Sequence, residues 1–159
     1  MAERVIATMV VGANGATSLA GTSAPLRSAA DRTRFLALRR SPEIAAIVVG
    51  GATAKVEPYQ KSPHPLIVVE RLELERSEIG EILANLRKRI HGTILCEGGA
   101  RLIHLLLSGD HIDTFFLSRV PINGDDHFLD QSLLRSTMDL VSSERDGSTT
   151  FERYERASR

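Results

Sequence analysis

Residues Thr93-Ile-Leu-Cys-Glu-Gly-Gly99 form a short apolar run that ends in two glycines, and Ile47-Val-Val-Gly-Gly51 repeats this pattern. An apolar run without alternation is typical of a strand that is covered on both faces, as in a parallel sheet. Two glycines after such a strand allow a sharp turn and let a ligand approach the main chain. The repeat therefore predicts a parallel sheet with two open turns where its strands end.

Strands and helices are expected to alternate on both sides of these two segments. A helix begins at Ser28, which is a suitable N-cap, and ends before Pro42. A second helix is expected over 77–90 with Ser77 as its cap, and a third over 100–107. We expect strands at 4–11, 44–49, 66–69, 93–96 and 112–120, a loop at 12–25, and a hairpin formed by 138–145 and 149–154.

This order predicts a single domain over residues 1–159. The runs 44–49, 66–69 and 93–96 are apolar throughout, so all three strands are expected to be buried on both faces. Only one helix is expected between Val69 and Thr93. The predicted fold class is a three-layer α/β/α sandwich whose central sheet is mostly parallel and ends in a C-terminal antiparallel hairpin.

Composition excludes several classes of protein. The 20 Lys and Arg residues balance 20 Asp and Glu residues, whereas a nucleic-acid-binding surface needs excess positive charge. No apolar run approaches the ~18 residues of a membrane span, and the start of the chain does not resemble a signal peptide. We therefore expect a cytoplasmic protein with neither nucleic acid nor membrane as partner.

The one cysteine and the scattered histidines do not form a metal-binding motif in the sequence. Cys96 is the one cysteine, which excludes an internal disulfide framework and favours an inert core residue. His104 is expected to pack or to cap within a buried helix. His127 follows two aspartates, which favours a solvated acidic turn over a metal ligand.

The two glycine pairs are the strongest binding signal. The second pair opens a helix, and free N–H groups at a helix N-terminus favour a phosphate. Ligands of open α/β sheets bind at the carboxyl ends of the strands. Two such turns favour a long ligand with separated anionic parts, such as a dinucleotide. Neither turn is a GxGxxG or Walker loop, so two alternatives stay open. The glycine pairs could be tight turns that bind no ligand, or they could belong to a phosphate-binding α/β protein of unrelated function.

Short motifs in a particular order support a family resemblance. They are Met9-Val-Val-Gly-Ala-Asn14-Gly15, Gly21-Thr-Ser23, Asp31-Arg32, Leu38-Arg39, Val49-Gly50-Gly-Ala-Thr53 followed by Glu57, Glu97-Gly98-Gly99, and Ile112-Asp113. As a set, these motifs resemble the reductase domain of riboflavin biosynthesis, which has the dihydrofolate-reductase-like fold.

The resemblance implies an NADPH-dependent reduction of a phosphorylated ribosylaminopyrimidine, in which the ring-opened ribose accepts hydride. It also implies a homodimer that pairs through an edge of the sheet. By position in the motifs, the cofactor-binding residues would be Gly50, Thr53, Glu57, Gly98, Gly99, Ala100, Arg101 and Leu102. The substrate-binding residues would be Asn14, Ser23, Arg39 and Glu97, with the Arg39 fork suited to a phosphate. No catalytic residue is identified.

The chain departs from the family pattern in three places. Asn14 replaces the acid of the family's loop, Gly12 replaces its serine, and the segment between Val69 and Thr93 is short. An amide cannot transfer a proton as a carboxyl group does. A degenerate member that binds a nucleotide or a partner without turnover is therefore the alternative hypothesis.

Overall fold

The computed structural model describes residues 3–56 and 63–158, and its centre is a seven-stranded sheet. The strand order is β4-β3-β5-β1-β6-β9-β8, in which the first five strands are parallel and β9 pairs antiparallel with both β6 and β8. The strands are β1 (Val5–Val11), β3 (Ile44–Gly50), β4 (Leu66–Val69), β5 (Thr93–Glu97), β6 (Thr114–Arg119), β8 (Met138–Asp146) and β9 (Thr149–Arg156).

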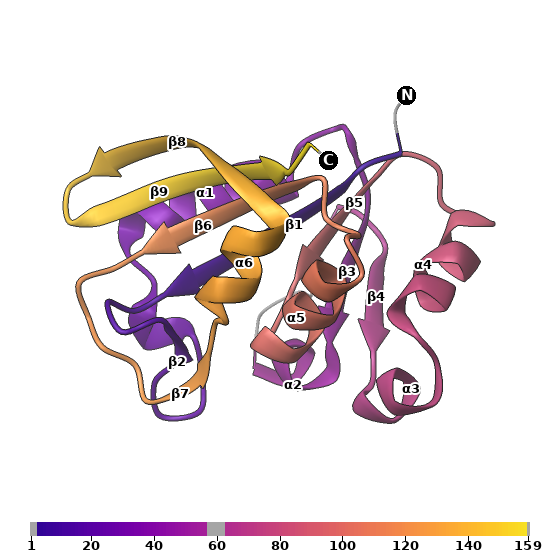
Figure 1. Cartoon of the computed structure of the whole chain (residues 1–159), viewed down its shortest axis with the longest axis horizontal. Coiled ribbons are helices and arrows are strands. Elements are labelled where there is room, and N and C mark those ends of the chain that lie inside the picture. Colours follow the sequence, from indigo (N-terminus) through magenta and orange to yellow (C-terminus); the bar gives the residue numbers. More distant parts are fainter. Residues whose placement is uncertain (1–2, 57–62, 159) are drawn as a thin grey trace.

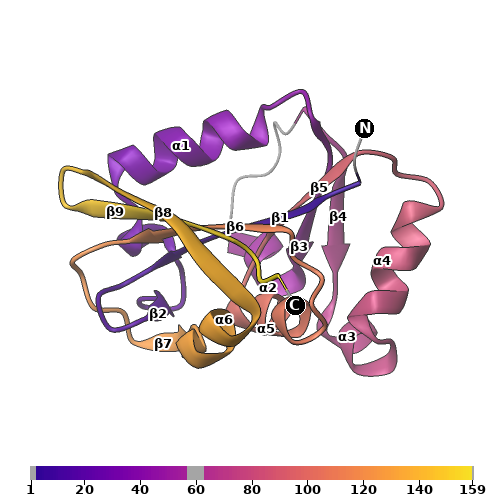
Figure 2. The same ribbon diagram turned by 45° about the horizontal axis from the view of Figure 1, so that its top comes forward.

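Helices cover both faces of the sheet (Figures 1 and 2). On one face lies α1 (Ala29–Arg39), and on the other lie α4 (Ile79–Arg87), α5 (Ala100–Ser108) and α6 (Gln131–Thr137). The predicted three-layer fold class is confirmed. Shorter elements are α2 (Gly51–Val56), α3 (Arg71–Arg76), the 3-10 helix Ala24–Leu26, and a two-stranded sheet of β2 (Ala16–Ser18) and β7 (Asp126–Phe128).

The two faces of the sheet are packed differently. The face under α4 and α5 carries a large apolar core, to which α5 contributes Leu102, Ile103, Leu106 and Leu107. The face under α1 carries a smaller apolar cluster, and the two buried residues of α1 itself are charged: Asp31 and Arg39. Buried charges are costly unless they are paired or hydrogen-bonded, so the partners of Asp31 and Arg39 decide how this face is built.

The connections place a crevice between β1 and β5. The chain leaves β1 toward α1 on one face of the sheet, whereas it leaves the neighbouring β5 toward α5 on the other face. Where two adjacent parallel strands connect to opposite faces, their carboxyl ends leave a crevice that ligands of open α/β sheets occupy. Thr8 of β1 and Glu97 of β5 lie side by side at this point.

Several boundaries differ from the sequence predictions. The segment 12–25 was expected to be a loop but contains β2, because β2 forms only by pairing with the distant β7. Two helices, α3 and α4, lie between Val69 and Thr93 instead of one. Ser77 is therefore the C-cap of α3, and α4 begins after Glu78 without a side-chain cap.

The prediction of burial on both faces is wrong for β4. This strand lies at the edge of the sheet, and Leu66 and Val68 are each 36% exposed. Its apolar run resembles that of β3, but only β3 has strands on both sides. No described helix is both long and apolar enough to cross a membrane.

Candidate functional site

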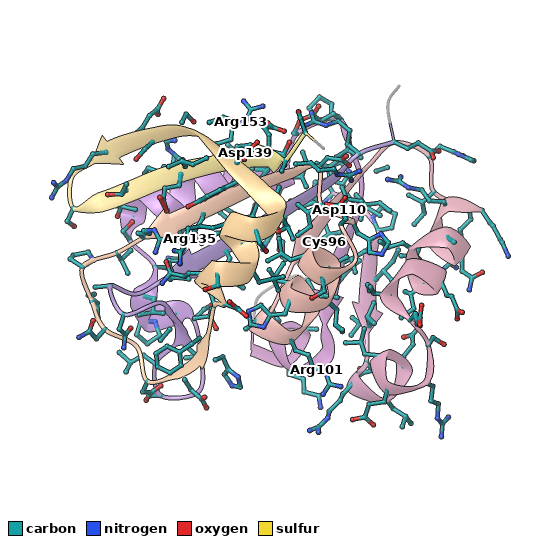
Figure 3. The ribbon with its side chains drawn as sticks, in the orientation of Figure 1. Cys96, Arg101, Asp110, Arg135, Asp139 and Arg153 are labelled. Atoms are coloured by element: carbon teal, nitrogen blue, oxygen red, sulfur yellow. The ribbon has the colours of Figure 1, made fainter. Side chains whose placement is uncertain are left out.

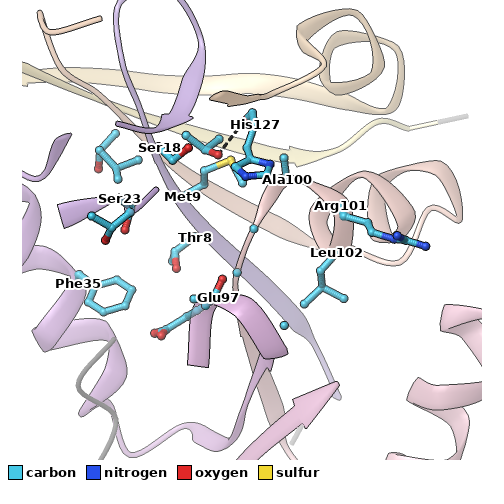
Figure 4. Close-up of a pocket in the computed structure, with 18 of the residues that line it drawn as sticks. Thr8, Met9, Ser18, Ser23, Phe35, Glu97, Ala100, Arg101, Leu102 and His127 are labelled. Atoms are coloured by element: carbon cyan, nitrogen blue, oxygen red, sulfur yellow. Dashed lines mark hydrogen bonds between the residues drawn. The ribbon is translucent and has the colours of Figure 1, made fainter. Parts of the chain in front are cut away.

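A cavity of about 790 Å³ opens at the carboxyl ends of the parallel strands. Its volume is within the range of about 300–1,000 Å³ that is common for small-molecule sites. The wall is formed by β1, β3, β5 and β6, by α1 from Asp31 to Leu38, by the start of α5 and by the β2 region. Figure 4 is a close-up of this cavity. The cavity therefore fills the crevice between β1 and β5.

The two glycine turns form one half of this cavity. Gly50, Gly98 and Gly99 all line it, together with Thr53. A Cβ atom added to Gly50 would meet nothing within 4 Å, and one added to Gly99 would meet only Thr53 Oγ1, at 3.8 Å. Open space therefore lies beside the main chain of Gly50 and Gly99, whereas a Cβ at Gly98 would lie 3.2 Å from Leu102 Cδ2.

The start of α5 points into the same half. Ala100, Arg101 and Leu102 line the cavity, and the helix N-cap, Gly99, provides no side-chain hydrogen bond. The first backbone bond of the helix runs from the Ile103 N–H to the Gly99 carbonyl. The N–H groups that precede it are available to an anion, which fits the pyrophosphate of a dinucleotide.

Charged side chains surround this glycine-lined half. Lys55, Arg71 and Arg101 contribute positive charge, and Glu70 also lines the wall. Figure 3 shows Arg101 projecting between α5 and α3. Glu75 Oε1 lies 3.0 Å from Arg71 Nε and 3.9 Å from Arg101 Nη2. The two guanidinium groups are thereby held close together on the rim.

Polar side chains form the other half, beneath α1. The sheet register pairs Thr8 with Glu97 on one side and with Phe116 on the other, so all three side chains project to the same face. Across the gap, α1 contributes Asp31 and Phe35, and Figure 4 shows Thr8, Glu97 and Phe35 converging. This half of the cavity is therefore a compartment between the sheet and α1. The sheet contributes the ring of Phe116 and α1 contributes the ring of Phe35.

Thr8 is the clearest sign that a ligand belongs in this compartment. The residue is 8% exposed, and its Oγ1 is buried without a hydrogen-bond partner among the described residues. An unsatisfied buried hydroxyl costs about 1–3 kcal/mol, and such groups usually have a partner. A polar atom of a bound ligand would supply it.

Asp31 is a second buried polar group on the wall. The residue is 8% exposed, and burial raises the pKa of its carboxyl group. A hydrogen bond from the Ser118 hydroxyl and the positive charge of Arg27 act in the opposite direction but do not offset the burial. Asp31 is therefore suited to hold a proton at a pH where an exposed aspartate has lost it.

Arg39 does not line the cavity. Its Nη2 lies 3.0 Å from Glu97 Oε2 and its Nε lies 3.4 Å from Glu97 Oε1, with both side chains almost fully buried. The guanidinium carbon also lies 4.3 Å from the centre of the Phe35 ring. Arg39 therefore lies behind two cavity-lining residues, Glu97 and Phe35, and contacts both. This position differs from the one expected for a residue that binds the substrate's phosphate.

Three further residues were predicted from the family motifs. Ser23 lines the cavity. Asn14 lies outside it: its Nδ2 donates to the Gly124 carbonyl and its Oδ1 accepts from the Gly124 N–H, which ties the β1–β2 turn to the loop before β7. Glu57 lies outside the described residues.

Sequence reasoning missed Thr8, Asp31 and Phe35 as wall residues. A signal was present in α1, because Asp31, Phe35 and Arg39 follow at intervals of four and share one helix face. Two charged residues on the face that meets the sheet indicate a polar site beneath the helix. Thr8 offered no such signal, since a threonine inside a strand is common.

The sequence also offered Cys96, His104 and His127 as candidates for a metal site or a reactive group. His104 Nε2 accepts a hydrogen bond of 2.9 Å from the Asp130 N–H, and burial lowers the pKa of its ring. Cys96 is buried, and its burial raises the thiol pKa to about 12. His127 lines the cavity from β7 and is exposed. Residues 3–56 and 63–158 bring together no metal-ligating cluster.

No family model and no curated protein matches the sequence. Solved structures do match over 98% of the chain. A diaminohydroxyphosphoribosylaminopyrimidine deaminase/5-amino-6-(5-phosphoribosylamino)uracil reductase of Thermotoga maritima is 17% identical, with a TM-score of 0.73 over 57% of its own length. RibD of Acinetobacter baumannii is 15% identical, with a TM-score of 0.71 over 58% of its length.

Dihydrofolate reductase of Enterococcus faecalis, solved with NADP(H), is 16% identical with a TM-score of 0.63, and 97% of that chain is covered. At these identities the similarity establishes the dihydrofolate-reductase-like fold and no more. The chain spans little more than half of the Thermotoga and Acinetobacter proteins.

Proposed function

We propose that this chain, which has the dihydrofolate-reductase-like fold, is an NADPH-dependent reductase of the riboflavin-biosynthesis type. Its substrate would be a phosphorylated pyrimidine whose ring-opened ribosylamino group accepts hydride. The observation that carries this proposal is the two-part cavity at the carboxyl ends of β1, β3 and β5. One half presents bare main chain and a helix N-terminus, and the other presents buried hydrogen-bonding groups.

The glycine-lined half fits a dinucleotide. Gly50 and Gly99 leave space for a pyrophosphate against the main chain, and Thr53 offers a hydroxyl to a phosphate or ribose. The positive charges of Arg71 and Arg101 on the rim favour the additional phosphate of NADPH over NADH. When bound, the nicotinamide supplies the hydride, while the protein aligns donor and acceptor.

The compartment beneath α1 fits the substrate. Glu97 and Thr8 present oxygen atoms to N–H and O–H groups of a pyrimidine, and the Phe35 ring offers a flat apolar surface to it. When a carbon accepts hydride, the adjacent nitrogen must accept a proton. Asp31 lines the same compartment, and its raised pKa favours the protonated carboxyl group that would deliver this proton.

The proposal includes a homodimer formed through β8. This strand is the outer edge of the sheet, and all its residues but the first are exposed, including Leu140 and Val141 at 51% and 53%. Two copies of β8 that run antiparallel about Ser142 would set Asp139 opposite Arg145, which is a favourable charge pair. Long bare edges of this kind are otherwise prone to uncontrolled pairing.

The test is a pair of measurements on the wild-type chain. NADPH and NADH are titrated by calorimetry, and NADPH oxidation is then followed with 5-amino-6-(5-phosphoribosylamino)uracil and, separately, with dihydrofolate. We expect tighter binding of NADPH and turnover of the pyrimidine alone. Binding without turnover of either compound supports the non-catalytic alternative. Absence of nicotinamide binding at millimolar concentration overturns the proposal.

A further inference from the structure

Arg39 and Glu97 form a buried ion pair directly behind the substrate compartment. The side chains are 8% and 3% exposed, and two nitrogens of the guanidinium lie opposite the two oxygens of the carboxylate. Glu97 lines the cavity and Arg39 does not. The pair therefore has one member at the wall and one behind it.

Phe35 holds the guanidinium from a second side. The Arg39 guanidinium carbon lies 4.3 Å from the centre of the Phe35 ring, and Phe35 is four residues earlier on the same helix. Stacking on an aromatic face and two-point contact with a carboxylate together restrict the plane of a guanidinium. Its position is thus determined by α1 and β5, with no need for a ligand.

The carboxylate gains a defined orientation from this contact. A buried carboxylate with a missing partner is strongly unfavourable, and paired Arg contacts select one orientation of its plane. In that orientation Glu97 lies beside Thr8, its neighbour in the sheet register, whose Oγ1 has no partner among the described residues. The Glu97 carboxylate and the Thr8 hydroxyl are thus neighbouring polar groups on the wall of the compartment (Figure 4).

We propose that Arg39 is a positioning residue, which orients the Glu97 carboxylate toward the substrate, and that it is not a ligand of the substrate's phosphate. This inference rests on the proposed function for the identity of the substrate. The phosphate is assigned instead to the region of Ser23, where Arg27 and Arg34 line the cavity.

Phosphate selectivity separates the two roles of Arg39. We compare 5-amino-6-(5-phosphoribosylamino)uracil with its dephosphorylated form in the wild type, Arg39→Met and Arg39→Lys. For Arg39→Met we expect kcat/KM to fall by about 100-fold for both compounds, because a displaced Glu97 affects the shared ring. The preference for the phosphorylated compound and the Kd for NADPH should each change by less than about twofold, as for independent sites.

Arg39→Lys retains the charge but loses the planar fork, so its kcat/KM should lie between those of the wild type and Arg39→Met. The matched variant Arg27→Met should behave in the opposite way and lose the preference for the phosphorylated compound. If Arg39→Met abolishes that preference while sparing the dephosphorylated compound, Arg39 binds phosphate and the proposal is wrong. Unchanged kinetics in Arg39→Met also overturn it.

A double variant covers the case in which Arg39→Met alone does not fold. Arg39→Met with Glu97→Gln removes both charges together, which avoids an isolated buried carboxylate. Its kcat/KM should equal that of Glu97→Gln alone, because a positioning residue has no effect once its target is changed. The proposal is wrong if the double variant has a lower kcat/KM than Glu97→Gln by the same factor that separates Arg39→Met from the wild type.

The same variants also test the role of Arg39 if the proposed reductase activity is absent. If the wild type does not oxidise NADPH, both pyrimidines are titrated by calorimetry without cofactor. Parallel loss of affinity for both compounds in Arg39→Met supports positioning. Equal affinity in the two proteins, or no binding to the wild type, overturns it.

Discussion

Thr8 and Asp31 are both buried polar residues on the wall of the cavity, but their surroundings differ. Asp31 has the Ser118 hydroxyl and the charge of Arg27 beside it. Thr8 Oγ1 has no partner within the described chain. A protein selected for stability alone would place valine at position 8, since valine has the same shape and no hydroxyl to satisfy.

Thr8→Val therefore separates stability from binding. We expect the free energy of unfolding to stay equal or to rise by up to about 1 kcal/mol, because an unsatisfied hydroxyl is removed. The KM for the pyrimidine should rise by about tenfold, which corresponds to one lost hydrogen bond. Urea unfolding and steady-state kinetics measure the two quantities.

Thr137→Val is the matched control for this substitution. Thr137 is equally buried, but its Oγ1 donates to the Leu133 carbonyl at 2.8 Å. This variant should lose stability and keep its KM. A destabilised Thr8→Val with an unchanged KM would show that Thr8 has a structural role only.

Asp31→Asn tests the proton-holding role through pH. Burial raises the pKa of Asp31 in the folded state, so its stabilising contribution is complete at acid pH and is lost as the pH rises through that raised pKa. Asparagine carries no charge at any pH. The stability of Asp31→Asn relative to the wild type should therefore increase as the pH rises from the ordinary carboxyl range toward neutrality.

Urea unfolding at a series of pH values measures this difference, and turnover should be lost in Asp31→Asn at every pH. Asp125→Asn is a suitable control, since Asp125 is exposed and does not line the cavity. A stability difference that grows toward acid pH would contradict the assignment.

Among the elements, α5 combines two tasks. Its apolar side anchors the large core through Leu102, Ile103 and Leu106, while its first turn borders the cavity. The helix can serve both because its N-cap is a glycine, at which an added Cβ atom would meet only Thr53 Oγ1, at 3.8 Å. A rigid helix thus presents unpaired N–H groups at a defined place.

A substitution series at Gly99 tests this arrangement. Gly99 has φ of −63°, which any residue can adopt, so added side chains should not strain the turn. We expect the Kd for NADPH to rise by about tenfold in Gly99→Ala and further in Gly99→Val, because each added group occupies the place of the pyrophosphate. Calorimetry gives both values.

Ser108→Ala, at the exposed opposite end of α5, should leave the Kd unchanged. Thermal unfolding shows whether the Gly99 variants remain folded. If Gly99→Val folds and binds NADPH as the wild type does, the cofactor does not contact the start of α5.

In the whole molecule, the sheet ends in two unlike edges. The β4 edge is short, whereas the β8 edge is nine residues long and exposed, with Asp139 labelled on it in Figure 3. If β8 pairs with a second copy, Val141→Lys should place two like charges close together and shift the dimer to monomer. Sedimentation at several protein concentrations measures the shift.

Leu72→Lys is the control for that experiment. Leu72 on α3 is as exposed as Val141, at 53%, but lies away from β8. It should leave the oligomeric state unchanged. A wild type that is monomeric at all concentrations, or a Val141→Lys variant that remains dimeric, would rule out pairing through β8.

Prediction from the sequence succeeded where the signal is local. The apolar runs of β3 and β5, the Ser28 cap of α1 and the turn between β8 and β9 each depend on residues close in the chain, and each was predicted. The elements that were missed are all short: β2, β7, α2, α3, α6 and the 3-10 helix Ala24–Leu26. Of these, β2 and β7 form only by pairing with each other across a long sequence separation. No local pattern of three residues could specify β2 or β7, whereas α6 does carry a local signal: its N-cap Asp130 accepts a hydrogen bond from the Leu133 N–H.

The candidate site divides in the same way. Its glycine-lined half could be read from two short segments, because a glycine after a buried strand has the same meaning in any parallel sheet. The half beneath α1 could not, since Arg39 and Glu97 are 58 positions apart and Thr8 gains its meaning only from having β5 and β6 as neighbours. Burial and pairing decide whether an arginine binds a phosphate or a carboxylate, and both are properties of the packed molecule.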